Sequence, residues 1–188
     1  MLIAVLSDIH DHLPNLRAAL ADIAKRVDDD GQPVGALICC GDLNSPFVVG
    51  ELAKGFQGPV TVVFGNNDGD RFRITVNAAG TNVTIAGETA VLELAGHRVF
   101  VHHFNDVGAI VAGAGQHDLV CYGHNHESLL RRTASGGRPR AIELNPGAIM
   151  GWRPGHGEVP ATYGVYNTNG TAAIHDALTG AELTRVDD

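Results

Sequence analysis

The chain has 188 residues, 44% of them hydrophobic, so we expect a single domain over residues 1–188 with a sizeable buried core. Its 13 Lys and Arg residues against 21 Asp and Glu residues give a net charge of −8, which argues against a broad basic surface for nucleic acid or anionic membranes. No apolar run approaches the ~20 residues that span a bilayer, and the N-terminus lacks the pattern of a signal peptide.

The three cysteines, Cys39, Cys40 and Cys121, lie in or beside apolar runs and lack Cys-x-x-Cys spacing. An odd number of cysteines in this setting predicts buried, reduced thiols rather than a disulfide framework or a structural zinc site. We therefore expect a cytoplasmic protein.

The first third of the chain alternates between strand and helix patterns. Continuous apolar runs predict buried strands at residues 2–6, 36–40 and 60–64. Apolar residues at helical spacing predict a helix from about residue 14 to 27, and a second helix is expected around residues 46–54. This order favours a parallel sheet, and ligands bind at the carboxyl ends of the strands in such sheets.

The pattern changes after Asn82. Short runs at residues 83–86, 89–94 and 98–102 are separated by glycine-containing turns, which is typical of antiparallel strands. A helix is expected at residues 106–114. Further strands are expected at residues 118–122, 128–132, 140–144, 162–167 and 172–177, with a turn at Ser135-Gly136-Gly137. We therefore predict an α/β protein with a mixed first sheet, a second mainly antiparallel sheet, and helices outside.

Polar residues follow the ends of the apolar strands. They are Asp8, His10, Asp42, Asn66, His103, His124 and His126. Two carboxylates, one amide oxygen and four imidazoles are too many ligands for one tetrahedral ion, and they suit two ions that share a bridge. Asp42 is the expected bridge because Gly41 permits close backbone approach. Without a thiolate, unless Cys40 turns inward, the set favours divalent Mn, Fe, Co, Ni or Zn.

These motifs, in this order, resemble those of calcineurin-like metallophosphoesterases. The matching segments are Asp8-Ile9-His10, Gly41-Asp42, Gly65-Asn66-Asn67-Asp68, the histidine that ends a strand, and Gly123-His124-Asn125-His126. Asn145-Pro146-Gly147-Ala148 further resembles the Asn-Pro-Gly-Ser turn of the small prokaryotic phosphodiesterase branch. The resemblance covers roughly residues 1–165. It implies a four-layer α/β/β/α sandwich of two mixed sheets with flanking helices.

The resemblance also implies how the metal ligands are divided. Asp8, His10 and His126 would hold the first ion. Asn66, His103 and His124 would hold the second, with Asp42 bridging both. The family's His-Gly is replaced here by His102-His103-Phe104; counting from Gly96 selects His103, with His102 as the alternative.

The activity implied is that of a phosphoesterase with two divalent metal ions, Mn before Fe, Zn, Co or Ni, which hydrolyses phosphodiesters through a metal-bound hydroxide. Asp42, Asn66, Asn67 and Asp68 are the expected catalytic residues. Many relatives have histidine at position 67, and an amide cannot deliver a proton at neutral pH, so phosphodiesters with good leaving groups should be preferred to alkyl phosphomonoesters. Asp68 and Asp11 would either orient ligand imidazoles or cap loops.

Two alternatives remain at this level. One is a phosphomonoesterase or nucleotide pyrophosphatase; the other is a non-catalytic binding module on the same fold. The expected partner is a phosphate-ester small molecule or nucleotide, with no sequence-specific nucleic acid and no membrane, and the resemblance allows a homo-oligomer.

Several other residues have two interpretations each. His12 lines the site mouth or is structural, and Trp152 is either a loop anchor or a platform for a nucleobase. The glycine-rich segment 147–157 either covers the site or only connects strands. Seven arginines also have two interpretations, because each either contacts substrate or lies on a solvated face. They are Arg71, Arg73, Arg131, Arg132, Arg138, Arg140 and Arg153.

Overall fold

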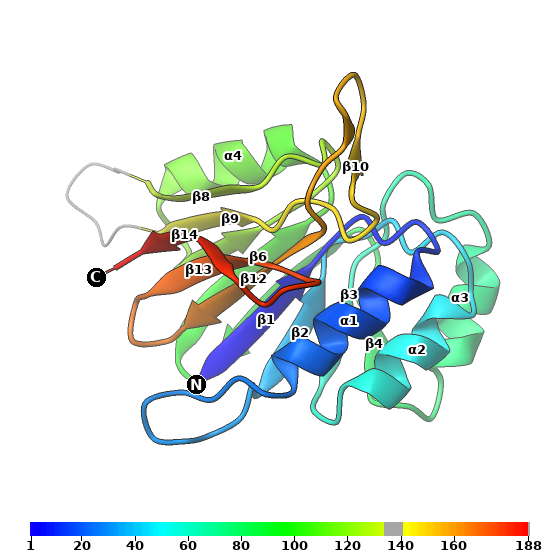
Figure 1. Ribbon diagram of the computed structural model, residues 1–188, viewed down its shortest axis with the longest axis horizontal. Coiled ribbons are helices and arrows are strands. Elements are labelled where there is room, and N and C mark those ends of the chain that lie inside the picture. The colour runs from blue at the N-terminus through cyan, green and yellow to red at the C-terminus, as the bar shows by residue number, and fades with distance from the viewer. Residues whose placement is uncertain (134–140, 188) are drawn as a thin grey trace.

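The computed structural model describes residues 1–133 and 141–187 and shows two stacked β-sheets with helices on both outer faces (Figure 1). The strands of the first sheet, in spatial order, are β14 (Glu182–Val186), β13 (Ala172–Asp176), β12 (Thr162–Asn167), β1 (Leu2–Leu6), β2 (Ala36–Cys39), β3 (Val60–Val62) and β4 (Val83–Ile85). The second sheet has the order β5 (Thr89–Leu94), β6 (His97–His102), β7 (Leu119–Cys121), β9 (Ile142–Asn145) and β8 (Leu129–Arg132). A short hairpin pairs β10 (Trp152–Arg153) with β11 (Gly157–Glu158).

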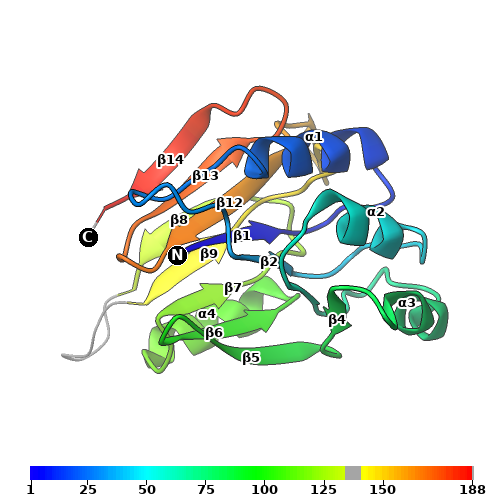
Figure 2. The same cartoon turned by 90° about the horizontal axis from the view of Figure 1, so that it is seen from below.

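Four helices of the described chain flank these sheets: α1 (Leu13–Ile23), α2 (Val48–Gly55), α3 (Arg71–Ala78) and α4 (Asn105–Ala114). Residues of α1, α2 and α3 pack on one face of the first sheet, and α4 covers the outer face of the second sheet (Figure 2). The predicted α/β fold with two mixed sheets is confirmed.

Side-chain alternation on the central strand separates the layers. Ala4 and Leu6 of β1 face the helices, whereas Ile3 and Val5 face the second sheet. Because both faces of β1 are covered, all five of its residues are buried. This burial explains why the strand reads as a continuous apolar run.

The first sheet differs from the prediction at β4. We expected residues 83–86 to begin the antiparallel region, but β4 pairs parallel with β3, with Val83 opposite Val60. The reason is α3, which the sequence analysis missed and which returns the chain to the same edge of the sheet. Only Ile74 and Ala78 of this helix are buried, too few to give a clear helical stripe; its start is capped by Asp70.

The second sheet is mixed rather than mainly antiparallel. β5 and β6 form the expected antiparallel hairpin, and β8 is antiparallel to β9. However, β7 lies parallel to both β6 and β9, because α4 provides the crossover connection between β6 and β7. The apolar pattern of a short strand does not show whether the strand runs parallel or antiparallel to its neighbours.

Smaller differences occur at element ends. Helix α1 ends at Ile23, and Val27 is 57% exposed and forms an isolated bridge with Pro33. The strands β10, β11 and β14 were not predicted; β14 is largely exposed, so it lacks an apolar pattern. The turn predicted at 135–137 and the residues Arg138 and Arg140 lie outside the described residues.

The three cysteines are free and buried, as predicted. No helix within residues 1–133 and 141–187 is long and apolar enough to cross a membrane.

Candidate metal centre

The predicted ligands converge at one edge of the stacked sheets. Each follows the carboxyl end of a parallel strand: Asp8 and His10 follow β1, Asp42 follows β2, Asn66 follows β3, His103 follows β6, and His124 and His126 follow β7. Parallel strands end at the same edge of their sheet, so residues far apart in the sequence meet there. The contacts below link all seven side chains.

One group consists of Asp8, His10 and His126. The two imidazole Nε2 atoms lie 3.1 Å apart, and Oδ1 of Asp8 lies 3.3 Å from Nε2 of His126 and 3.8 Å from Nε2 of His10. Asp8 and His126 are buried, and His10 is half-buried. Three ligand atoms at this spacing could hold one metal ion.

The second group is centred on Asp42. Its Oδ2 lies 3.4 Å from Nε2 of His103 and 3.5 Å from Nε2 of His10, almost midway between the two groups. Oδ1 of Asn66 lies 3.0 Å from Nε2 of His103 and 2.9 Å from Nδ1 of His124. The side chains of Asp8, Asp42 and His103 form a second triad that is close enough to hold an ion. Asp8 therefore belongs to both triads, and its carboxylate lies near the histidines of both groups.

The structure separates His102 from His103. His103 is fully buried at the cluster, whereas His102 stacks on Phe100 and accepts the backbone N–H of Phe104 at 3.0 Å. The two side chains point to opposite faces because they are neighbours in an extended segment. Only His103 lies within reach of Asp42 and Asn66.

Hydrogen bonds to carbonyl groups orient two of the imidazoles. Nδ1 of His103 lies 2.7 Å from the carbonyl oxygen of Cys40, and Nδ1 of His126 lies 2.7 Å from that of Trp152. A carbonyl only accepts, so each Nδ1 carries the proton, and each Nε2 of the neutral ring presents a lone pair to the cluster. These lone pairs face carboxylate and amide oxygens, which is unfavourable unless a cation or a proton lies between them.

A buried carboxylate oxygen also lacks a hydrogen-bond partner. Oδ1 of Asp8 is buried and unpaired, although Oδ2 of the same group accepts the backbone N–H of His124 at 3.0 Å. A buried carboxylate oxygen that accepts no hydrogen bond is costly, and such atoms are normally paired or bound to metal. The donor set therefore fits a pair of divalent cations.

The pKa values of the cluster reflect the contacts between its carboxylates and its imidazoles. Burial by itself would raise the pKa of Asp8, but the contacts with His10 and His126 outweigh it and hold that pKa well below its usual value. Burial would likewise lower the pKa of His103, but the carboxylates of Asp42 and Asp8 raise it. The site thus favours positive charge next to both carboxylates.

Neighbouring polar residues fix the position of Asp42. Asn67 donates its backbone N–H to Oδ1 and its side-chain amide to Oδ2 of Asp42, both at 2.8 Å. Asp68 accepts the backbone N–H groups of Asp42 at 3.1 Å, of Gly65 at 2.7 Å and of Asn44 at 3.0 Å. Asp68 therefore joins the two loops that carry Asp42 and Asn66, and does not orient an imidazole.

Asp11 likewise contacts a neighbouring loop rather than one of the predicted metal-binding side chains. Its carboxylate accepts the backbone N–H and the hydroxyl of Ser45 at 3.0 and 2.7 Å. Of the two interpretations open for Asp11 and Asp68, these contacts match that of loop caps.

The backbone at the centre is unusual. Asp8, His10, Asp42, His124 and His126 all have positive φ, between 44° and 74°. Non-glycine residues rarely adopt this left-handed conformation, and they cluster where the surrounding structure holds a functional geometry. The strand-end turns therefore aim successive side chains into the cluster at some cost in local backbone energy.

Close approach explains two of the glycines. A Cβ at Gly65 would lie 2.2 Å from Oδ1 of Asp42, and a Cβ at Gly123 would lie 1.8 Å from Oγ of Ser7 and 2.5 Å from Oδ2 of Asp8. Neither position can accept a side chain without displacing a carboxylate of the centre.

Several supporting groups were not predicted from the sequence. Asn145 donates its amide to the carbonyl of Gly123 at 3.2 Å and to Oδ1 of Asn125 at 2.8 Å, and so holds the loop that carries His124. The Asn-Pro-Gly motif signalled this residue but not its role. The carbonyl groups of Cys40 and Trp152 gave no signal, because every residue has one.

Most of the described arginines have acidic or backbone partners. Arg131 pairs with Glu143 at 2.8 Å, and Arg153 pairs with Glu127 at 2.5 Å. Arg71 binds Glu88 and the carbonyl oxygen of Gly65, each at 2.9 Å, so it supports the loop before Asn66. These contacts favour structural roles over direct contact with substrate.

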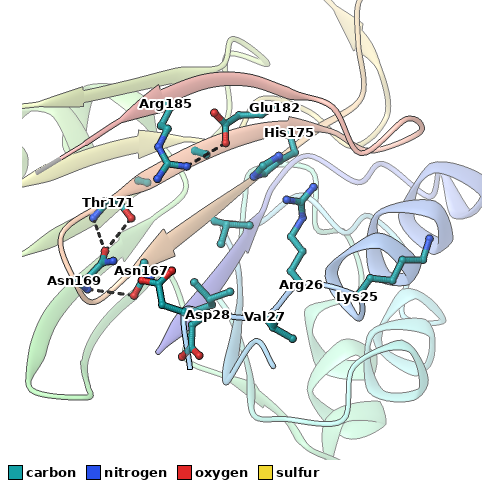
Figure 3. A pocket seen from close by; sticks show the side chains of 15 residues that line it. Lys25, Arg26, Val27, Asp28, Asn167, Asn169, Thr171, His175, Glu182 and Arg185 are labelled. Carbon is teal, nitrogen blue, oxygen red and sulfur yellow. Dashed lines mark hydrogen bonds and ion pairs between the residues drawn. The ribbon is translucent and has the colours of Figure 1, made fainter. Parts of the chain in front are cut away.

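A cavity of about 400 Å³ lies at the other end of β1 (Figure 3). Leu2, at the start of β1, lines it, whereas Asp8 follows the end of that strand. Arg185 and Glu182 of β14 form an ion pair at its wall, and Arg26 is bound to Asp22 at 2.7 Å. None of the seven predicted ligands is among the described residues that line this cavity, so it is separate from the centre.

Two stacked mixed sheets between helices, with an Asp, Asn and His cluster at the strand ends, define the metallophosphoesterase class of α/β proteins. The sequence matches the calcineurin-like phosphoesterase superfamily domain over residues 1–171, and the chain belongs to this family.

Individual relatives agree with this assignment. The chain is 30% identical over 171 residues to Phosphodiesterase MJ0936 of Methanocaldococcus jannaschii, which covers 89% of this chain and 93% of the relative. The structure of an archaeal phosphodiesterase matches with a TM-score of 0.73 and 29% identity over 90% of this chain and 94% of that one. The Escherichia coli phosphoesterase YfcE matches with a TM-score of 0.67 at 21% identity, over 99% of this chain and 98% of its own, and shares the fold.

Proposed function

We propose that this protein is a metal-dependent phosphodiesterase whose centre holds two divalent ions. The observation that carries the proposal is the unpaired, buried Oδ1 of Asp8 beside imidazole nitrogens whose lone pairs face other acceptors. Such an arrangement is unfavourable unless a cation or a proton lies between the facing acceptors. Homology to a phosphodiesterase supports the choice of reaction.

The distances support the following division of ligands. Asp8, His10 and His126 would hold the first ion. Asn66, His103 and His124 would hold the second. Asp42 would serve both ions, because its Oδ2 lies almost equally far from Nε2 of His10 and Nε2 of His103, at 3.5 and 3.4 Å. Oxygen and imidazole donors without thiolate suit Mn²⁺, with Fe, Co, Ni or Zn as alternatives.

When bound, the ions supply Lewis-acid activation of water and neutralise charge on the phosphate ester. The chain's own residues position these groups. Asn67 and Asp68 fix Asp42 and its loop, and the carbonyl groups of Cys40 and Trp152 fix the tautomers of His103 and His126.

The residue at position 67, Asn67, cannot act as a general acid in the proposed reaction. Both donor groups of Asn67 are directed at Asp42, and an amide does not release a proton at neutral pH. We therefore propose that diesters with good leaving groups are the preferred substrates, ahead of alkyl monoesters. We further propose that the chain works as a single domain, and the buried free cysteines support a location in the reducing cytoplasm.

Metal analysis and hydrolysis of bis(p-nitrophenyl) phosphate with added Mn²⁺ test this proposal. Wild-type protein should bind two ions and hydrolyse the diester faster than p-nitrophenyl phosphate. Asp42→Ala and His126→Ala should each lose on the order of 99% of the activity or more, because each substitution removes a metal-binding side chain. His156→Ala, at an exposed loop position, serves as the control. Equal rates for wild type and Asp42→Ala would overturn the catalytic role and favour a binding module.

A further inference from the structure

A mostly apolar cavity of about 730 Å³ is lined by residues that contact two of the predicted ligands through backbone hydrogen bonds. Its lining includes His12, Trp152, Pro160 and Leu178, with Glu158 and Asp176 as its acidic members. Nothing in the assignment of the seven ligands accounts for this cavity.

The chain connects the cavity directly to the centre. His12 lies two residues after His10, and the carbonyl of Trp152 accepts the Nδ1 proton of His126 at 2.7 Å. The backbone N–H of Met150, another lining residue, donates to the carbonyl of Asp8 at 3.1 Å. A molecule whose phosphate lies at the cluster could therefore extend into the cavity.

Trp152 is exposed at this position. It begins the β10–β11 hairpin, with Glu158 as its cross-strand neighbour, and the hairpin rises away from both sheets (Figure 1). Trp152 is 42% exposed and belongs to none of the buried hydrophobic clusters of the described chain. A loop anchor would be buried, so the exposed indole favours the alternative of a stacking platform.

The charge of the cavity restricts its ligand. Among the described residues that line it there is no Lys or Arg, whereas Glu158 and Asp176 contribute carboxylates. A second phosphate or another anionic group would be repelled here. An uncharged aromatic ring fits the apolar wall, and the carboxylates can accept hydrogen bonds from amino, imide or hydroxyl groups.

We propose that this cavity binds the nucleoside part of a nucleotide-type phosphodiester, with the base stacked on the indole of Trp152. The identity of the neighbouring phosphate site rests on the function proposed above. Trp152 is then a specificity residue, and sugar phosphates and esters with a second anionic group are poor substrates.

Direct binding can be measured because Trp152 is the single tryptophan of the chain. Thymidine 5′-monophosphate added to the metal-loaded protein should quench the tryptophan fluorescence in a saturable manner, and ribose 5-phosphate should not. Equal quenching by both compounds, or by neither, would overturn the proposal.

Kinetics provide a second test with a matched pair of esters. Thymidine 5′-(p-nitrophenyl phosphate) and methyl p-nitrophenyl phosphate have the same leaving group and differ in the nucleoside. Trp152→Ala should raise KM for the nucleoside ester and lower the ratio of kcat/KM values, nucleoside ester over methyl ester, about tenfold. Trp152→Phe should retain most of this ratio, and His156→Ala, in the same hairpin, should leave it unchanged.

The outcomes distinguish this inference from the proposed function. If wild-type protein hydrolyses both esters but Trp152→Ala leaves their ratio unchanged, the nucleoside site is wrong and the phosphodiesterase proposal stands. If neither ester is hydrolysed, the phosphodiesterase proposal fails, and the fluorescence titration alone decides whether the cavity binds a nucleotide.

Discussion

Asn67 binds both carboxylate oxygens of Asp42, through its backbone N–H to Oδ1 and its side-chain amide to Oδ2, each at 2.8 Å. The side-chain amide of Asn67 is thereby directed at the carboxylate that we propose both ions share. In that proposal, this contact relates the geometry of the metal site to the preference for good leaving groups.

Substitution of Asn67 should separate these two effects. Asn67→Ala removes one hydrogen bond to a charged group, and we expect kcat for an aryl diester to fall about tenfold. Asn67→His introduces a proton donor, so the dependence of kcat/KM on leaving-group pKa should become shallower than in wild type. A series of aryl methyl phosphates measures this slope; an unchanged slope in Asn67→His would contradict the explanation.

The adjacent histidines His102 and His103 provide a matched pair. His103→Ala should remove one of two bound ions and reduce activity by at least about a hundredfold, because its Nε2 faces Asp42 and Asn66. His102→Ala should retain both ions, because that ring stacks on Phe100 away from the cluster. Metal content by mass spectrometry checks the prediction, and the opposite pattern would assign the ligand to His102.

Gly65 should not tolerate even a methyl group. A Cβ there would lie 2.2 Å from Oδ1 of Asp42, so Gly65→Ala must displace the carboxylate, and we expect metal affinity to fall about tenfold or more. Gly69→Ala is the control, since no atom lies within 4 Å of a Cβ at that position. Calorimetric titration measures the Mn²⁺ affinity of both variants. Similar affinities would contradict the prediction, because they would show that the loop accommodates the methyl group without displacing Asp42.

Metal ions should stabilise the folded protein through Asp8. Each ion at a free concentration of 100 times its Kd adds about 2.7 kcal/mol to the free energy of unfolding, and the contribution of the first ion should disappear in Asp8→Asn. Asp11→Asn should keep it, because Asp11 binds Ser45 instead. Unfolding with and without EDTA gives the increase for each protein, so differences in intrinsic stability cancel. If Asp8→Asn showed the same metal-dependent increase in the free energy of unfolding as wild type, Asp8 would not be a metal ligand.

The protein should lose stability in acid partly through His175. This side chain is 4% exposed, packs on Tyr163 and has an unpartnered Nδ1. Burial, followed by the nearby charge of Arg26, lowers its pKa from 6.5 to about 4. The unfolded chain therefore takes up a proton near pH 6.5 and the folded chain only near pH 4, so stability is complete above 6.5 and falls as the pH drops towards 4.

His175→Phe tests this pH dependence. The variant keeps an aromatic ring beside Tyr163 but has no titrating group, and it should avoid a loss on the order of 3 kcal/mol across this pH range. The free energy of unfolding in urea, measured at several pH values in EDTA, gives the difference between the two proteins. Parallel pH profiles would show that His175 is protonated equally in both states.

The sequence alone predicted the ligand types and most of the framework. Continuous apolar runs marked the buried strands, and polar residues after them, such as Asp8 and Asp42, marked the edge where ligands gather. These signals are local, because strand periodicity and strand ends depend on neighbouring residues. The helix α3 was missed because its stripe consists of only Ile74 and Ala78.

Tertiary structure decided what these residues can do together. It placed His103 rather than His102 beside Asp42, oriented His126 through the carbonyl of Trp152, and held the strand-end residues in left-handed conformations. These features arise from contacts between segments more than 20 residues apart, such as Trp152 and His126. Residue identity does not specify such contacts, since any carbonyl can accept the proton and only the packed sheets determine which one lies within reach.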